Sequence, residues 1–204
     1  MRAGAPYIVA VQGLKSSGKT TVAEALIASL SARGYRTGSV KLTGHARLDL
    51  DARGTDTHRH AEAGAEFVLA RSTEETFLLR LRPADPEPLF ALAAREAQFV
   101  ICEGCRDPGV DSTVLCLRTP AEIEETLKQR GLKREQVIAF SGSAAGSAAQ
   151  TGQKAILPWF DVRLAGEREA LVDLIVAAAG GPRAAGKAAG PLSLNPEWQP
   201  GEPH

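Results

Sequence analysis

The chain has 204 residues, of which 44% are hydrophobic and 24% charged, a composition typical of a soluble globular protein. Its 24 Lys and Arg residues balance its 24 Asp and Glu residues, which argues against a general nucleic-acid or membrane-surface binder. No apolar run approaches the roughly 20 residues of a membrane helix, and the first 13 residues do not form a signal peptide.

Along the chain, apolar β-branched runs alternate with helical stretches, as in a parallel sheet covered by helices. The first helix is predicted from apolar residues on one face and a glycine at its C-terminal end. In the first half we expect strands at 7–12 and 37–42, helices at 19–33 and near 57–63, and a strand pair at 66–72 and 76–81.

In the second half, Pro86 lies in the first turn of a predicted helix, where proline is tolerated. A further helix begins with a capping box formed by Thr119 and Glu122 and ends at Gly131. We expect helices at 85–97, 119–131 and 167–179, and strands at 98–104, 113–118, 136–142 and 155–160.

This alternation predicts a three-layer α/β/α fold with a mostly parallel sheet. Residues 1–179 would form one domain, because the chain is too short for two full domains. Residues 180–204 are rich in Gly, Pro and Ala without periodicity, so we predict a disordered tail.

A phosphate-binding motif, G-x-x-x-x-G-K-[ST], stands between the first predicted strand and the first helix. Its two glycines allow a tight turn that directs backbone N–H groups into one concavity, beside the positive end of the helix dipole. Lys19 would reach the β- and γ-phosphates, and the Thr20 hydroxyl would bind Mg²⁺. The predicted phosphate-binding residues are Gly13, Leu14, Lys15, Ser16, Ser17, Gly18, Lys19, Thr20 and Thr21.

The polar stretch after the second predicted strand leaves the same rim of the sheet as the phosphate loop. Asp49 and Asp51 alternate with leucines, so in an extended segment both carboxylates point one way and could hold the Mg²⁺ shell or orient a water. Incidental charge on a solvated loop is the alternative. The histidines His45, His58 and His60 lack the number and spacing of ligands that a zinc site needs.

Glu103 ends the buried strand at 98–104, the position of the acid in a Walker B strand. There it could bind Mg²⁺ through water or act as a base toward the attacking water. An ordinary surface acid is the alternative. We therefore predict Lys19, Asp49 and Glu103 as catalytic residues and Thr20, Asp49 and Glu103 as metal ligands.

The three cysteines, an odd number, fit free thiols in a reducing cytosol, so we expect a cytoplasmic protein. Cys102 and Cys105 form a C-x-x-C pair, but a redox dithiol normally lies at a helix start, whereas Cys102 lies inside an apolar strand. We therefore predict core packing for Cys102 and Cys116.

The ordered set "GLKSSGKTT", "VKLTGH", "DLDARGTDTHRHAEAGA", "CEGCR" and "VLCLR" resembles the molybdopterin-guanine dinucleotide biosynthesis adapter family, MobB. The resemblance spans residues 7 to about 118. Outside the loop, matching positions are Lys41, Thr43, His45, Asp49, Asp51, Gly54, Asp56, Arg59, Ala63, Gly64, Ala65, Glu103, Gly104 and Arg118.

The resemblance implies a GTP-binding, weakly hydrolysing P-loop protein that uses Mg²⁺ and is commonly a homodimer. It would assist the conversion of molybdopterin to its guanine dinucleotide form, beside the molybdenum cofactor guanylyltransferase. Asp51 and Arg106 are expected near the nucleotide. Arg106 stands where the family has lysine and keeps a positive charge that could meet a phosphate.

Two other functions remain open from the residues. One is a small-molecule kinase, in which Asp49 or Glu103 activates an acceptor hydroxyl. The other is a nucleotide-gated metallochaperone that uses the histidines and Cys105. Guanine selection cannot be predicted from a motif, because the chain has no N-K-x-D or T-K-x-D; the small-residue loop after residue 140 could contact a base or be a linker.

Overall fold

The computed structural model describes residues 6–42, 54–80, 96–105, 109–145 and 157–181. It separates into two compact units, one formed by residues 1–42 and 92–204 and the other by residues 43–91. Most of the predicted helix at 85–97 and most of the predicted tail lie outside the described residues.

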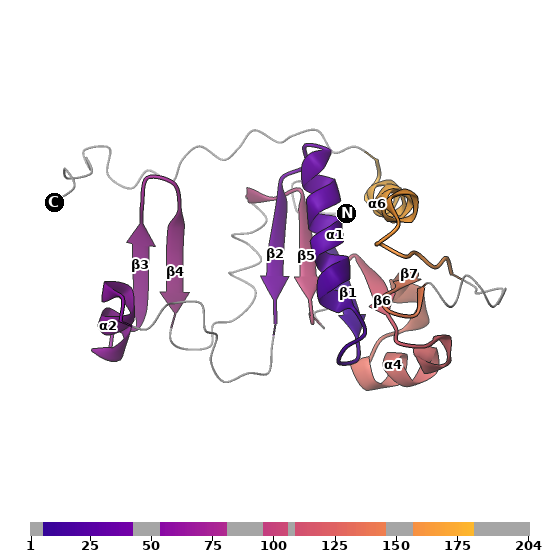
Figure 1. Ribbon diagram of the computed structural model, residues 1–204, viewed down its shortest axis with the longest axis horizontal. Coiled ribbons are helices and arrows are strands. Elements are labelled where there is room, and N and C mark those ends of the chain that lie inside the picture. Colours follow the sequence, from indigo (N-terminus) through magenta and orange to yellow (C-terminus); the bar gives the residue numbers. More distant parts are fainter. Residues whose placement is uncertain (1–5, 43–53, 81–95, 106–108, 146–156, 182–204) are drawn as a thin grey trace. The chain divides into compact units, whose positions relative to one another are not determined.

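The larger unit is built on a five-stranded parallel sheet with the order β2-β5-β1-β6-β7 (Figure 1). The central strand β1 is buried almost throughout, as the apolar run in the sequence predicts. The strands are β1 Tyr7–Gly13, β2 Thr37–Lys41, β5 Phe99–Glu103, β6 Ser112–Cys116 and β7 Val137–Ser141.

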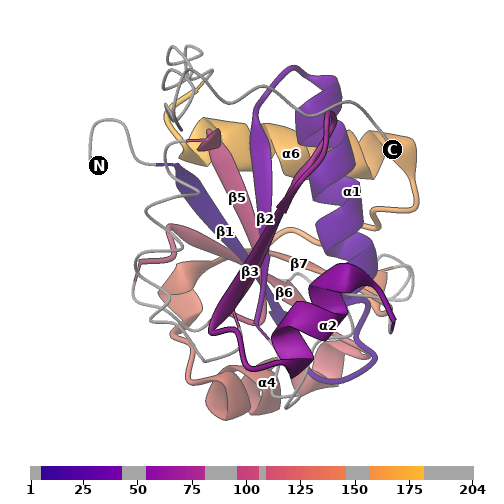
Figure 2. The same ribbon diagram turned by 90° about the vertical axis from the view of Figure 1, so that its left-hand side faces the viewer.

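Helices cover both faces of this sheet. Alternate residues of the strands, among them Val114 on β6, pack against α1 Lys19–Ala32 and α6 Ala165–Ala178, which contact each other and cross in the view of Figure 2. Leu115, the next residue of β6, faces the other way and packs with α4 Ile123–Arg130. The alternation of side chains along a strand thus produces the three predicted layers.

The strand order indicates where on the sheet a ligand would bind. The chain leaves β1 toward β2 on one side, whereas β6 and β7 lie on the other side of β1. Ligands of open parallel sheets bind at the carboxyl ends of the strands where the order reverses in this way. The end of β1, which carries the phosphate loop, is that point.

The smaller unit contains α2 Asp56–Glu62 and an antiparallel pair, β3 Phe67–Arg71 and β4 Thr76–Arg80. The hydroxyl of Thr55 caps α2 by accepting a hydrogen bond from the backbone N–H of His58 at 3.2 Å. Both the helix and the strand pair were expected from the sequence.

Three local predictions differ from the structure. Within the described part of 155–160, only Trp159 makes a bridge to β7. Thr119 does not cap its helix with its side chain. Instead, Glu122 accepts hydrogen bonds from the backbone and guanidinium of Arg118, at 3.1 and 2.9 Å, and such charge-assisted bonds are stronger than a neutral cap.

The third difference concerns the cysteines. Both Cys102 and Cys116 are buried, as predicted, but Cys102 is joined to Cys105 in a disulfide. Gly104 has a positive φ of 84°, which turns the chain at the end of β5 and brings Cys105 back beside Cys102. Burial raises the pKa of the free thiol of Cys116 to about 12.

Within the described ranges, no helix has the length and apolar character that crossing a membrane requires.

Candidate functional site

The phosphate loop connects the buried end of β1 to an uncapped helix. Gly18, the residue before α1, has a positive φ of 88°. Among the described residues, no side chain caps this end of α1, and its first turn has no acidic residue. The first N–H groups of α1 and its positive dipole end are therefore open to an anion.

The loop rests directly on the ends of β6 and β7. A Cβ at Gly13 would collide with the carbonyl of Cys116, and one at Gly142 would collide with the carbonyl of Ser17. The backbone N–H of Ser143 donates to the same Ser17 carbonyl at 3.1 Å. These contacts fix the loop against the sheet and require glycine at positions 13 and 142.

Lys19, the first residue of α1, reaches back over the loop. Its Nζ donates to the carbonyl of Leu14 at 2.6 Å. Burial lowers the pKa of this ammonium from its ordinary value, and the positive charge of Arg130 lowers it further. A partly desolvated ammonium above a phosphate loop is stabilised by a negatively charged ligand.

Glu103 and Thr20 meet beside this loop. The carboxylate oxygens of Glu103 lie 3.3 and 3.2 Å from the Thr20 hydroxyl, which donates to them. The pair forms because β5 lies next to β1 in parallel register, so the end of β5 faces the start of α1. A hydroxyl and a carboxylate are oxygen ligands of the kind that Mg²⁺ prefers, so these residues fit the predicted metal.

Lys41 completes this group of charges. Its ammonium lies 3.3 Å from the Glu103 carboxylate, because Lys41 and Glu103 are register partners in β2 and β5. The sequence motif contained Lys41 but gave it no role. The pairing of β2 with β5, which no short motif encodes, was needed to bring the two side chains together.

Several other candidate residues lie outside the described ranges or on α2. Asp49, Asp51, His45 and Arg106 lie outside the described residues. The ε nitrogen of His58 pairs with its helix neighbour Glu62 at 3.3 Å. Among the described residues, no group of three His, Cys, Asp or Glu side chains could hold a metal ion.

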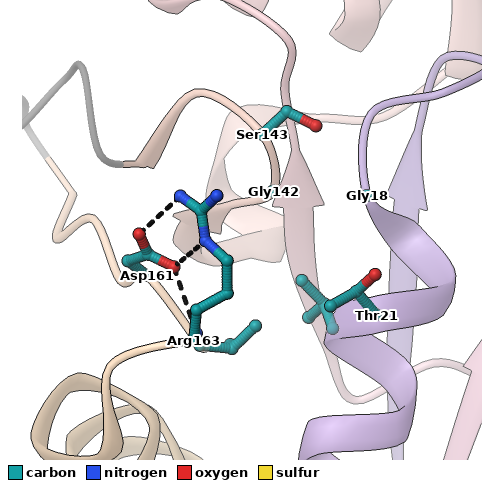
Figure 3. Close-up of a pocket in the computed structure, with 8 residues that line it drawn as sticks. Gly18, Thr21, Gly142, Ser143, Asp161 and Arg163 are labelled. Carbon is teal, nitrogen blue, oxygen red and sulfur yellow. Dashed lines mark hydrogen bonds and ion pairs between the residues drawn. The ribbon is translucent and has the colours of Figure 1, made fainter.

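The structure has a pocket next to the phosphate loop (Figure 3). Of its lining residues, only Gly18 and Thr21 were predicted as site residues from the sequence. It has a volume of about 110 Å³, more than the roughly 30 Å³ of a single water. An ion pair between Asp161 and Arg163, which precede α6, lies on one side of the pocket, opposite Thr21 of α1. The lining residues are Gly18, Thr21, Val22, Gly142, Ser143, Asp161, Val162 and Arg163.

Residues 8–141 match the family model for MobB, described as molybdopterin guanine dinucleotide synthesis protein B. This match covers well over half of the chain. The chain belongs to the MobB family. The resemblance predicted from the sequence is thereby confirmed.

MobB relatives match in sequence and in fold. The molybdopterin-guanine dinucleotide biosynthesis adapter protein of Escherichia coli is 31% identical over 113 residues, which are 53% of this chain and 64% of that relative. The protein of the same name from Haemophilus influenzae is 29% identical over 143 residues, or 59% of this chain and 79% of that relative. Crystallised Bacillus subtilis MobB superposes with a TM-score of 0.65 at 25% identity, covering 84% of this chain and 97% of that one. The predicted α/β fold is confirmed.

The support of the loop by β7 can be tested with Gly142→Ala. We expect this variant to lower the free energy of unfolding by about 1–3 kcal/mol, because alanine must adopt a strained positive φ and its Cβ meets the Ser17 carbonyl. Urea denaturation followed by circular dichroism measures the change.

Gly166→Ala is the matched control, since a Cβ at Gly166 in α6 meets open space. It should be neutral or stabilising by about 0.5–1 kcal/mol. Equal stability of Gly142→Ala and the unmodified protein would show that the loop does not depend on this contact.

Proposed function

We propose that this MobB protein is a GTP-binding, weakly hydrolysing adapter that assists the conversion of molybdopterin to its guanine dinucleotide form. The observation that carries the proposal is the meeting of Lys19, Thr20 and Glu103 at the uncapped N-terminus of α1. The family match and the names of the relatives support the pathway.

In this proposal the loop binds the phosphates of the nucleotide. Backbone N–H groups of residues 13–21 donate to phosphate oxygens, and the ammonium of Lys19 exchanges the Leu14 carbonyl for the β- and γ-phosphates. Thr20 and Glu103 hold Mg²⁺, which when bound neutralises charge on the phosphates. Asp49 and Asp51 would add to the same site.

Glu103 also has the position of a base. Its carboxylate is mostly buried, with 16% of the side chain exposed, and it lies between the Thr20 hydroxyl and the Lys41 ammonium. There it can orient a water toward the terminal phosphate and accept its proton. The ammonium of Lys41 lies 3.3 Å from this carboxylate and holds it in place, so Lys41 is a positioning residue.

The adapter role follows from what the site would do with GTP. A chain that holds GTP and hydrolyses it slowly can present the guanine nucleotide to the molybdenum cofactor guanylyltransferase, the proposed partner that forms the bond to molybdopterin. Asp51 and Arg106 remain proposed contacts to this nucleotide.

Lys19→Ala tests nucleotide binding. We expect at least about a hundredfold loss of affinity for GTP, measured by calorimetry in the presence of Mg²⁺, because the charge-assisted bonds to the phosphates are lost. The stimulation of guanine dinucleotide formation by the guanylyltransferase should be lost in parallel.

Lys128→Ala, which removes an exposed lysine from α4, is the control and should bind GTP normally. Unchanged affinity in the folded Lys19→Ala protein would exclude the loop as the nucleotide site.

Glu103→Gln separates binding from hydrolysis. The amide keeps the shape of the side chain but is a poor base and metal ligand, so we expect phosphate release from GTP to fall at least about tenfold, more than GTP affinity falls. Single-turnover hydrolysis and calorimetry give the two quantities. Glu135→Gln, an exposed change, should leave both intact. Turnover equal to that of the unmodified protein would remove Glu103 from the mechanism.

We also propose that the chain forms a homodimer through the apolar face of its β3–β4 pair. Leu69 and Leu78 are register partners on this face, 52% and 56% exposed, and Phe67 on the same face is 62% exposed. Three large apolar side chains together on one face favour a covered interface, and a second copy offers an identical face.

Leu69→Asp should convert the dimer to a monomer, because it places a charge in the centre of the proposed interface. Light scattering coupled to size-exclusion chromatography measures the mass. Leu164→Asp, at an equally exposed leucine of the larger unit, should remain dimeric. A dimer that persists in Leu69→Asp would place the interface elsewhere.

A further inference from the structure

The pocket beside the phosphate loop shares residues with the loop itself. Gly18 and Thr21 belong to both, and Thr21 is the last of the residues that would bind the phosphates. Gly142 and Ser143, at the end of β7, form another part of its wall and also support the loop. A nucleotide whose phosphates rest on the loop would therefore have this pocket next to its α-phosphate, where the sugar and base begin.

Asp161 holds the side chain of Arg163 in a fixed orientation at this pocket. One carboxylate oxygen accepts hydrogen bonds from the backbone N–H and Nε of Arg163 at 3.1 and 2.7 Å, and the other accepts from Nη2 at 2.6 Å. Only 9% of the Asp161 side chain is exposed, and its backbone N–H donates to Glu167 at 2.6 Å. The carboxylate is thus a fixed support for the guanidinium.

Arg163 keeps one edge of its guanidinium for another ligand. Asp161 takes Nε and one hydrogen of Nη2, which leaves Nη1 and the second hydrogen of Nη2. Within the described ranges, Nη1 makes no hydrogen bond, and 62% of the side chain is exposed. Figure 3 shows the guanidinium between Asp161 and the pocket. This edge presents two parallel donors and no acceptor.

We infer that Arg163, oriented by Asp161, recognises the base of the bound nucleotide as guanine. Two parallel donors match the N7 and O6 acceptors of guanine, the commonest bidentate contact of arginine with a base. Adenine has N7 but presents an amino group in place of O6, which sets donor against donor. The inference rests on the proposed function, since it requires a nucleotide on the phosphate loop.

This assignment supplies a base-selecting group in a chain without an N-K-x-D or T-K-x-D motif. In this assignment the Asp161 carboxylate does not contact guanine itself, because both of its oxygens already accept hydrogen bonds from Arg163. Arg163 reads only N7 and O6. Hypoxanthine, which keeps both atoms and lacks the 2-amino group of guanine, should therefore be accepted as well.

The test compares the affinities of GTP, ITP and ATP for the unmodified protein and for Arg163→Ala and Arg163→Lys, with Mg²⁺ present. We expect the unmodified protein to bind GTP and ITP alike, about tenfold or more tighter than ATP. Both variants should lose this preference. Lysine keeps the charge and the ion pair but lacks the two-pronged edge, so it separates recognition from simple attraction.

Arg134→Ala, which breaks a surface pair with Glu124 at α4, is the matched control and should keep the preference for GTP. The inference is overturned if Arg163→Ala still prefers GTP over ATP, if ITP binds as weakly as ATP, or if all three affinities fall equally in both variants, which would indicate a phosphate contact. An unmodified protein that binds none of the three nucleotides would overturn the proposed function as well. If both Arg163 variants still bind nucleotide but lose the preference for GTP over ATP, the inference and the proposed function are both supported.

Discussion

The structure depends on one constraint, the seating of the loop before α1 on the ends of β6 and β7. Gly13 and Gly142 allow backbone to pack on backbone there, and the Ser17 carbonyl accepts a hydrogen bond from Ser143. This contact fixes the uncapped N-terminus of α1 against the sheet and keeps Lys19 above the loop. Without it, the helix dipole and the ammonium would have no fixed position toward a phosphate.

The remaining groups come to this point through the sheet. Parallel register places the end of β5 beside the start of α1 and beside the end of β2, so Glu103 lies between Thr20 and Lys41. On the other side, the end of β7 and the residues before α6 form the pocket that contains the Asp161–Arg163 pair. One edge of the sheet therefore carries the phosphate loop, the Glu103 carboxylate beside the Thr20 hydroxyl, and the oriented guanidinium of Arg163.

The features with local signals were predictable. The loop motif, the apolar strands and the glycine-terminated helices depend on short-range patterns. The five-stranded sheet confirms the strands, and Gly34 after α1 and Gly131 after α4 confirm the helix ends. The Lys41–Glu103 pair needed the register of two strands far apart in sequence. The position of Arg163 was missed because it belongs to no short motif and depends on how the segment before α6 folds beside the phosphate loop. The disulfide was missed because the turn at Gly104 is not visible in a C-x-x-C spacing. The single domain over 1–179 and the cytoplasmic location stay predictions.

The central claim is that backbone N–H groups of the loop and the first turn of α1 receive the phosphates of GTP. Amide hydrogen exchange of the unmodified full-length chain, with and without Mg²⁺ and GTP, tests it most directly. The account predicts that exchange slows at residues 13–21, since their N–H groups gain acceptors. Slowed exchange elsewhere, with no change at residues 13–21 under saturating GTP, would contradict it.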